Sequence, residues 1–328
     1  MFKKSYQIRD VETVLSADSI VYKIKNGELY SVNNKPIKVS EHVFSYSTKN
    51  GDVFFQKENL SNLIRMSLTH LSTINVEGTF SLRGAFFVGN KQIYILGKSE
   101  GKKMVYVLDI NSLKIHSKID YDCFPFISTS KGCICKIKSG LQYVDTSLQQ
   151  AFWSYSFPEG EKVAGNIFLY EGVLVVPSMG EQAPDSKDYL YGINVESGEL
   201  LWKRDGSFQY YQLVKSSGLL YGFAHGLYEV TDIESGEKLV NKKLTDDLWV
   251  SQHMNSIGDG GLYFVGGTHT NMGMFISKFG KINTETHEIE FIQKLDVAEG
   301  IKADPPIYHK GKLYIKDSLD TLHVYERE

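Results

Sequence analysis

Short runs of alternating apolar and polar residues, each bounded by a turn signal, recur along the whole chain, and no segment has the spacing of an amphipathic helix. One phrase repeats: a glycine or turn residue, a variable residue, and an apolar run rich in aromatics. Its third position falls at Val53, Ile93, Ile134, Leu174, Leu220, Leu262 and Leu313. The intervals are 40, 41, 40, 46, 42 and 51 residues. A period near forty residues is typical of propeller blades.

A second phrase follows the better copies of the first one. An Asp or Asn ends a strand, and a short turn with a Gly or another tolerant residue leads into the next strand. The copies of this phrase begin at Asp109, Asn194, Asp232 and Asn283. The short side chain can accept hydrogen bonds from the turn backbone. Each period is therefore predicted to hold about four strands joined by hairpins.

These patterns predict an all-β fold, a seven-bladed β-propeller forming a single domain over residues 1–328. The predicted blade cores cover about 42–79, 83–120, 123–157, 165–205, 209–245, 251–296 and 302–327, with an additional N-terminal segment 20–32.

The last blade reaches the C-terminus after three predicted strands, so we expect an N-terminal strand to complete it, because open strand edges are avoided. The expected segment is Ile20–Val32, which contains the hairpin signal Asn26-Gly27. Eight blades is the alternative, if the Gly27 copy forms its own blade. Its distance of 24 residues from the next copy favours seven.

The stretch YLYGINVESGELLWK over residues 189–203 resembles the repeat of quinoprotein-like (PQQ-repeat) β-propellers, which has the form LYALD-x-x-TGE-x-x-W. The copy at 219–240 matches less fully and has Val240 in place of the Trp, and the copies at 106–116 and 279–291 are weaker. Trp202 takes the blade-locking position, and Trp153 is a looser equivalent. Many enzymes of this family carry adjacent cysteines, which this chain does not. The resemblance therefore implies the propeller fold in a non-enzymatic member, with no cofactor.

Charge and hydropathy exclude two kinds of partner. The 36 Lys and Arg against 39 Asp and Glu give a net charge of −3, without the basic surplus of a nucleic-acid binder. No stretch approaches the roughly 18 to 20 apolar residues of a membrane span. Lys3 and Lys4 suit a signal peptide, but Arg9, Asp10 and Glu12 interrupt an apolar core. We expect a cytoplasmic protein, or a periplasmic one if a leader has been removed.

The three cysteines do not indicate a disulfide framework. Cys133 and Cys135 share a face of a predicted strand, at positions where other copies have Ile or Val, which favours buried structural thiols. The alternative is a metal site in which Cys123 is a further ligand, but we do not expect a bound metal.

Two histidines suggest a second kind of site. His253 begins a predicted innermost strand, and His269 lies in a loop between the second and third strands of the same blade. Together with Arg83 and Asp304, they could form a polar site at the central channel, for general-base work, a small ligand or a metal. Solvated loop residues are the simpler interpretation, and no catalytic residue is assigned.

The loops that join one blade to the next place carboxylates beside aromatic rings, and in a propeller these loops converge on one face. The predicted partner-binding residues are Asp120, Tyr121, Asp122, Phe208, Tyr210, Tyr211, Asp246, Asp247, Trp249 and Glu299. Aromatic anchors in an acidic field suit a protein partner with a basic or mixed surface. The polar loop 178–188 would extend this face.

The sequence therefore predicts a non-catalytic protein-binding module, either an assembly scaffold or an inhibitor of the immunity-protein type. One alternative is an enzyme or ligand binder with its site in the central channel. Another is an envelope assembly scaffold whose leader has been removed.

Overall fold

The computed structural model of the chain describes residues 2–328 except 17–19, 33–35, 41–42, 50–51, 58–61, 68–72, 78–79, 89–90, 100–101, 121–123, 181–186, 207–210, 225, 245–247, 271–272 and 299. For part of the described strands, β9 and β10 among them, only the backbone is described. The described residues form strands and turns and contain no helix. The all-β prediction is confirmed.

The described strands form eight antiparallel sheets, four in each of two compact units. Unit 2 covers Val11–Ser156, and its sheets are β2 (Val11–Ser16), β3 (Ile20–Ile24), β4 (Leu29–Val32) and β5 (Pro36–Ser40); β6 (Val43–Lys49), β7 (Asp52–Lys57), β8 (Asn62–Ser67) and β9 (Thr73–Glu77); β10 (Phe80–Val88), β11 (Gln92–Ser99), β12 (Lys102–Asp109) and β13 (Ile115–Asp120); and β14 (Phe124–Ser128), β15 (Gly132–Ile137), β16 (Gly140–Asp145) and β17 (Ala151–Ser156).

Unit 1 covers Met1–Asp10 and Phe157–Glu328. Its sheets are β18 (Glu161–Val163), β19 (Phe168–Tyr170), β20 (Val173–Gly180), β21 (Tyr189–Asn194) and β22 (Leu200–Asp205); β23 (Tyr211–Val214), β24 (Leu219–Ala224), β25 (Leu227–Asp232) and β26 (Lys238–Lys243); β27 (Trp249–Gly258), β28 (Gly261–Thr270), β29 (Gly273–Asn283) and β30 (Ile289–Lys294); and β31 (Ile307–His309), β32 (Lys312–Lys316), β33 (Leu322–Arg327) and β1 (Phe2–Ile8).

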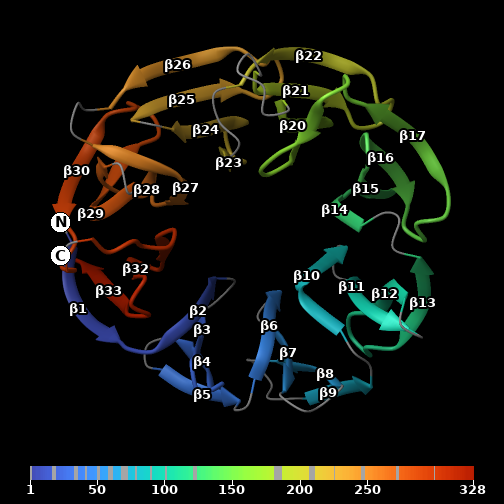
Figure 1. Cartoon of the computed structure of the whole chain (residues 1–328), viewed down its shortest axis with the longest axis horizontal. Helices are drawn as coiled ribbons and strands as arrows, with labels where there is room; N and C mark the ends of the chain where they lie inside the picture. The colour runs from blue at the N-terminus through green and yellow to red at the C-terminus, as the bar shows by residue number, and fades with distance from the viewer. Residues whose placement is uncertain are drawn as a thin grey trace. The chain divides into compact units, whose positions relative to one another are not determined.

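Neighbouring sheets of a unit meet through their first strands. In unit 1, β27 contacts both β23 and β31, and in unit 2, β10 contacts both β6 and β14. Figure 1 shows the sheets of each unit following one another in chain order. The middle strands carry the buried apolar runs, and the outer strands alternate exposed and half-buried residues. This is the layered pattern of propeller blades.

The eight sheets agree with the alternative prediction of eight blades, so the preferred number of seven blades is corrected. The additional sheet is formed by residues 11–40, where β2 to β5 have only four to six residues each. Asn26-Gly27 is a hairpin turn as predicted, but it joins the second and third strands of this sheet. The interval of 24 residues was measured from the third strand of this sheet, β4, to the second strand of the next sheet, β7. It therefore underestimated the length of the blade.

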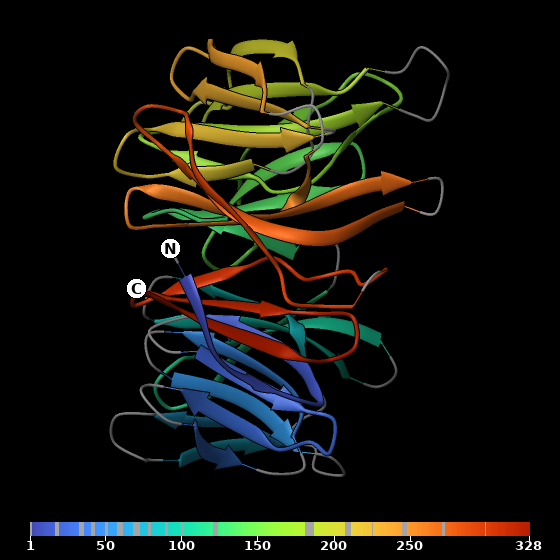
Figure 2. The same ribbon diagram turned by 90° about the vertical axis from the view of Figure 1, so that its left-hand side faces the viewer.

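The sheet that ends the chain is closed by an N-terminal strand, as predicted, but by β1 rather than by Ile20–Val32. β1 pairs antiparallel with β33, with Phe2 opposite Arg327 and Ile8 opposite Leu322. Figure 2 shows the two termini side by side at this pair. Phe2 is only 4% exposed and meets the ring of Tyr263 edge-on at 5.9 Å. We call β31, β32, β33 and β1 the closing sheet.

The Asp and Asn turns have the predicted chemistry. The Oδ1 atom of Asn194 accepts from the backbone N–H groups of Glu196 at 2.9 Å and Ser197 at 3.0 Å. Asp109 and Asn283 do the same in their own turns. In each turn, the position predicted for a Gly or another tolerant residue has a positive φ. The residues at this position are Gly198, Gly236, Leu113 and His287.

These turns are also where neighbouring sheets are held together. The Trp202 indole donates from Nε1 to the Ile233 carbonyl of the next sheet at 3.0 Å, which confirms its blade-locking position. Its ring leaves no room for a Cβ at Gly236, where such an atom would lie 2.5 Å from Cδ2. Arg65, Tyr94 and Tyr221 donate in the same way to Ile110, Thr146 and Thr284.

Candidate functional site

In unit 1, the loops that leave the sheets ending in β22 and β26 begin beside the hairpin loop between the second and third strands of the same sheet. The Gly206 N–H donates to the Asp188 carbonyl at 2.7 Å, and the Leu244 N–H donates to the Gly226 carbonyl at 3.1 Å. In each of these unit 1 sheets, the two kinds of loop therefore form one surface. This is the junction face.

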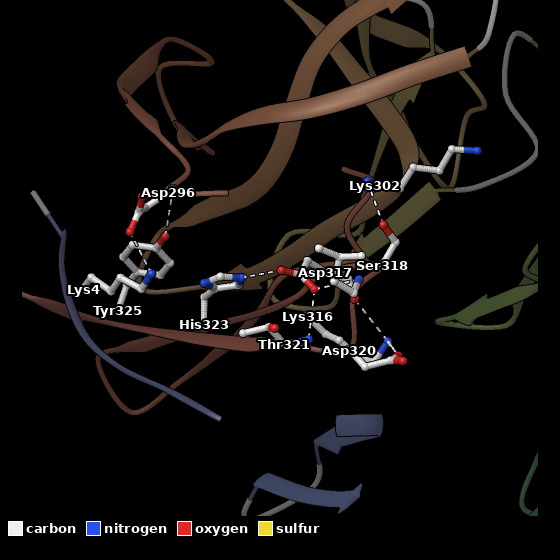
Figure 3. Close-up of polar contacts among 11 residues, drawn as sticks. Lys4, Asp296, Lys302, Lys316, Asp317, Ser318, Asp320, Thr321, His323 and Tyr325 are labelled. Carbon is white, nitrogen blue, oxygen red and sulfur yellow. Dashed lines mark hydrogen bonds and ion pairs between the residues drawn. The ribbon is translucent and has the colours of Figure 1, made fainter. Parts of the chain in front are cut away.

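The part of the junction face described most fully belongs to the closing sheet. It consists of segment 295–306 without residue 299, which leads from β30 into β31, and segment 316–323, which contains the β32–β33 loop. We call these two segments, with Lys4 and Tyr325, the closing-sheet cluster (Figure 3).

The two segments of the cluster are cross-bonded through their backbones. The Ser318 N–H donates to the Lys302 carbonyl at 2.8 Å, and the Lys302 N–H donates to Ser318 Oγ at 3.1 Å. The Asp304 N–H donates to the Lys316 carbonyl at 2.8 Å, and Ala303 forms a β-bridge with Asp317. The junction segment and the hairpin loop therefore hold each other in place.

Asp317 is the buried centre of the cluster. Its Oδ1 accepts from the backbone N–H groups of Leu319 and Thr321, both at 2.9 Å. Its Oδ2 lies 2.7 Å from His323 Nε2, and both side chains are about 95% buried, with exposures of 5% and 4%. Since a carboxylate only accepts, Nε2 is the protonated nitrogen and donates to it. The other ring nitrogen, Nδ1, is buried and finds no hydrogen-bond partner among the described residues.

The charges at the surface of the cluster are mixed. The Lys316 ammonium lies 3.1 Å from an Asp320 oxygen and 3.5 Å from an Asp304 oxygen. Lys4 donates to Asp296 at 2.8 Å, and this bond lowers the pKa of the Asp296 carboxyl. The described part of the chain gives the exposed Lys302 ammonium no ion-pair partner. Beside these charges, the Leu319 side chain is 64% exposed.

The predicted partner-binding residues fall into three groups. Asp120 is exposed at the end of β13 in unit 2, and Trp249 is half-buried at the start of β27 in unit 1. Tyr211 is only 1% exposed and its hydroxyl lies 3.3 Å from Glu229, so it is a core residue and not a surface anchor. The remaining ones lie outside the described residues: Tyr121, Asp122, Phe208, Tyr210, Asp246, Asp247 and Glu299.

The backbone separates the two histidines of the predicted channel site. Val250 pairs with Gly266 and Asn255 with Phe264, so His253 lies opposite segment 264–266. His269 is opposite Met274, at least three residues farther along β28, or roughly 10 Å. Of the other two residues, Asp304 belongs to the closing-sheet cluster. Arg83 lies on β10, with its side chain outside the described residues.

The cysteines correct one expectation. Cys133 is a buried free thiol, and burial raises its pKa to about 11. Cys135 is disulfide-bonded, whereas the number and spacing of the cysteines did not predict a disulfide. The one other cysteine in the chain is Cys123, which lies outside the described residues. Among the side chains that the structure describes, no three His, Cys, Asp or Glu residues form a group suited to a metal ion.

Four-stranded antiparallel sheets joined in series through their inner strands define the class of protein as a β-propeller. BamB from Moraxella catarrhalis is similar over 100% of both chains, with a TM-score of 0.64 and 13% identity. The Dos1 propeller has a TM-score of 0.63 and 9% identity over 99% of this chain and 95% of that one. A europium-containing methanol dehydrogenase has a TM-score of 0.58 and 8% identity over 99% and 93%.

At these identities the likeness shows the fold alone. It confirms the β-propeller class. By sequence, no known family and no curated protein matches this chain. Over the described residues, no helix is long and apolar enough to cross a membrane.

Proposed function

We propose that the chain is a non-catalytic protein-binding module and that its partner docks on the junction face. The observation that carries the proposal is the closing-sheet cluster, in which backbone hydrogen bonds fix two loops while charged and apolar side chains remain at the surface. Loops fixed before binding lose little conformational entropy when a partner docks. A module of this kind could act as an assembly scaffold or as an inhibitor.

The described charges favour a partner with a mixed surface over a strongly basic one. Asp296, Asp304 and Asp320 each have a lysine within 4 Å, so these carboxylates are already partly neutralised. Matching single charges across an interface contributes more to specificity than to affinity.

We also propose that the protein works in an oxidising compartment such as a bacterial periplasm. Disulfides persist in such compartments and are rare in the cytosol, and Cys135 is disulfide-bonded. This proposal favours the envelope alternative over the cytoplasmic expectation.

Affinity capture of the full chain from its native host, followed by mass spectrometry, tests the function. We expect a protein recovered at a fixed ratio to the chain. Asp246→Lys and Asp247→Lys combined with Trp249→Ala should weaken its capture at unchanged melting temperature. Glu234→Lys with Glu285→Lys, in the turns that join third and fourth strands, is the control with the same number of reversed charges. Equal capture by both variants would reject the junction face.

A further inference from the structure

Leu319 is an unusually exposed apolar side chain in a rigid setting. It is 64% exposed, more than any other large apolar side chain in the described part of the chain. The next most exposed is Leu239, at 50%, on the outer strand β26. A leucine held in water at the tip of a loop contributes nothing to the core, so its burial by a partner remains available as binding free energy.

The loop that carries Leu319 is held from inside and outside. Inside, Asp317 accepts from the N–H group of Leu319 itself. The Asp317 N–H donates to the Thr321 carbonyl at 2.9 Å, and the Asp320 N–H donates to the Asp317 carbonyl at 3.1 Å. Outside, the loop is bonded to Lys302 through Ser318. The position of the leucine is therefore set before any partner arrives.

One charge beside the loop, that of Lys302, has no carboxylate opposite it in the described part of the chain. Lys316 is shared between Asp304 and Asp320, whereas Lys302 is exposed and the described residues provide no carboxylate for it. Figure 3 shows the Lys302 side chain extending away from the paired charges. A partner that covers this surface gains most by placing a carboxylate opposite Lys302.

We propose that Leu319 is the anchor of the docking surface, and that the partner is a folded protein with an apolar pocket for this side chain and a carboxylate at the rim of that pocket, facing Lys302. This inference rests on the proposed function and specifies its contact point. A buried apolar anchor with a polar rim is the usual anatomy of a protein–protein hot spot.

The test uses the full chain carrying the photo-crosslinking amino acid p-benzoylphenylalanine at position 319, expressed in the native host and irradiated. The same amino acid at positions 249 and 239 provides a second junction-face position and an outer-strand control. We expect one discrete protein adduct from position 319 and none from position 239.

Competition then measures the contribution of each residue. Unlabelled wild-type chain should suppress the position-319 adduct. Leu319→Ala should need at least about tenfold more protein, since tenfold corresponds to about 1.4 kcal/mol and truncating a hot-spot residue costs about 2 kcal/mol or more. Lys302→Glu should also compete more weakly, with a smaller dependence on salt. Leu239→Ala should compete as well as the wild type, which controls for the loss of an exposed leucine.

Each contrary result separates this inference from the proposed function. An adduct from position 249 but not from 319, or equal competition by Leu319→Ala, overturns the anchor and leaves the binding function standing. An adduct with a second copy of the chain, or with lipid, also overturns the anchor as described. No adduct from either junction-face position contradicts both proposals.

Discussion

At the residue scale, the closing-sheet cluster depends on one buried carboxylate. Asp317 accepts from two backbone N–H groups and from His323, and all three donors lie in or next to the loop that carries Leu319. Buried donors without a partner cost about 1–3 kcal/mol each, whereas an exposed ion pair contributes about 1 kcal/mol or less. The loop geometry is therefore far more sensitive to Asp317 than to the charges around it.

Asp317→Ala should lower the free energy of unfolding by about 2–3 kcal/mol, because water can replace only part of the three lost bonds. Asp304→Ala removes the same group from an aspartate whose side chain is 62% exposed, and should cost less than about 0.5 kcal/mol. Urea titrations of both variants measure the difference. Similar losses for the two would show that Asp317 does not organise the loop.

Thiol labelling tests the state of the cysteines. The folded chain should react slowly with N-ethylmaleimide at pH 8, because Cys133 is buried and its pKa is raised to about 11. After denaturation without reductant we expect one label, on Cys133, and after reduction three. The neutral thiol favours the folded state, so its contribution to stability is complete below the unfolded pKa near 8.5 and is lost as pH rises toward about 11. Three labels without reductant would contradict the disulfide.

At the element scale, four pairs of neighbouring sheets are linked by a donor side chain that reaches the turn of the next sheet. Trp202 does this in the copy that best matches the PQQ repeat, and the sequence predicted it. Arg65, Tyr94 and Tyr221 do the same with other chemistry. Sequence comparison of the copies missed them because the three side chains have little in common except a donor of suitable length.

Gly236→Ala tests the Trp202 contact. Gly236 and Gly260 both have positive φ, +74° and +68°, so alanine is strained at either position by about 1–2 kcal/mol. An added Cβ meets nothing within 4 Å at Gly260 but lies 2.5 Å from the Trp202 ring at Gly236. We therefore expect Gly236→Ala to cost about 1–3 kcal/mol more than Gly260→Ala in thermal or urea unfolding. Equal costs would show that the ring packs there only loosely.

At the scale of the whole molecule, the two chain ends are joined in one sheet, and much of this was predictable. The repeat period predicted the sheets, and the incomplete last copy predicted an N-terminal closing strand. The choice of strand failed because Lys3 and Lys4 at the start of β1, FKKSYQI, suit the charged start of a signal peptide, and this drew attention away from its strand-like alternation. Its buried side depends on Phe2 packing against β28 and β29, more than 250 residues away.

The closing-sheet cluster could be predicted only in part. The sequence singled out Asp304, which belongs to it. The contact between segments 302–304 and 316–318 is set by how two loops pack in the folded chain, and no spacing in the sequence signals it. The sequence also gives no sign that Leu319 is exposed, because an isolated leucine in a turn is equally compatible with a small satellite core.

Phe2→Ala tests the closure. It removes a ring that is 4% exposed and should destabilise the chain by about 3–5 kcal/mol. Phe152→Ala removes the same ring where it is 47% exposed, on β17, and should cost less than about 1 kcal/mol. Melting temperatures of the two variants report the difference. A Phe2 variant as stable as the Phe152 variant would mean that β1 does not close the sheet in solution.

The central claim is that a protein partner docks on the junction face, and hydrogen–deuterium exchange on the purified complex tests it most directly. The account predicts that binding slows exchange in segments 300–306 and 317–321, while the outer strands β22, β26 and β30 exchange as in the free chain. Protection confined to those outer strands, with the two loop segments unchanged, would contradict it.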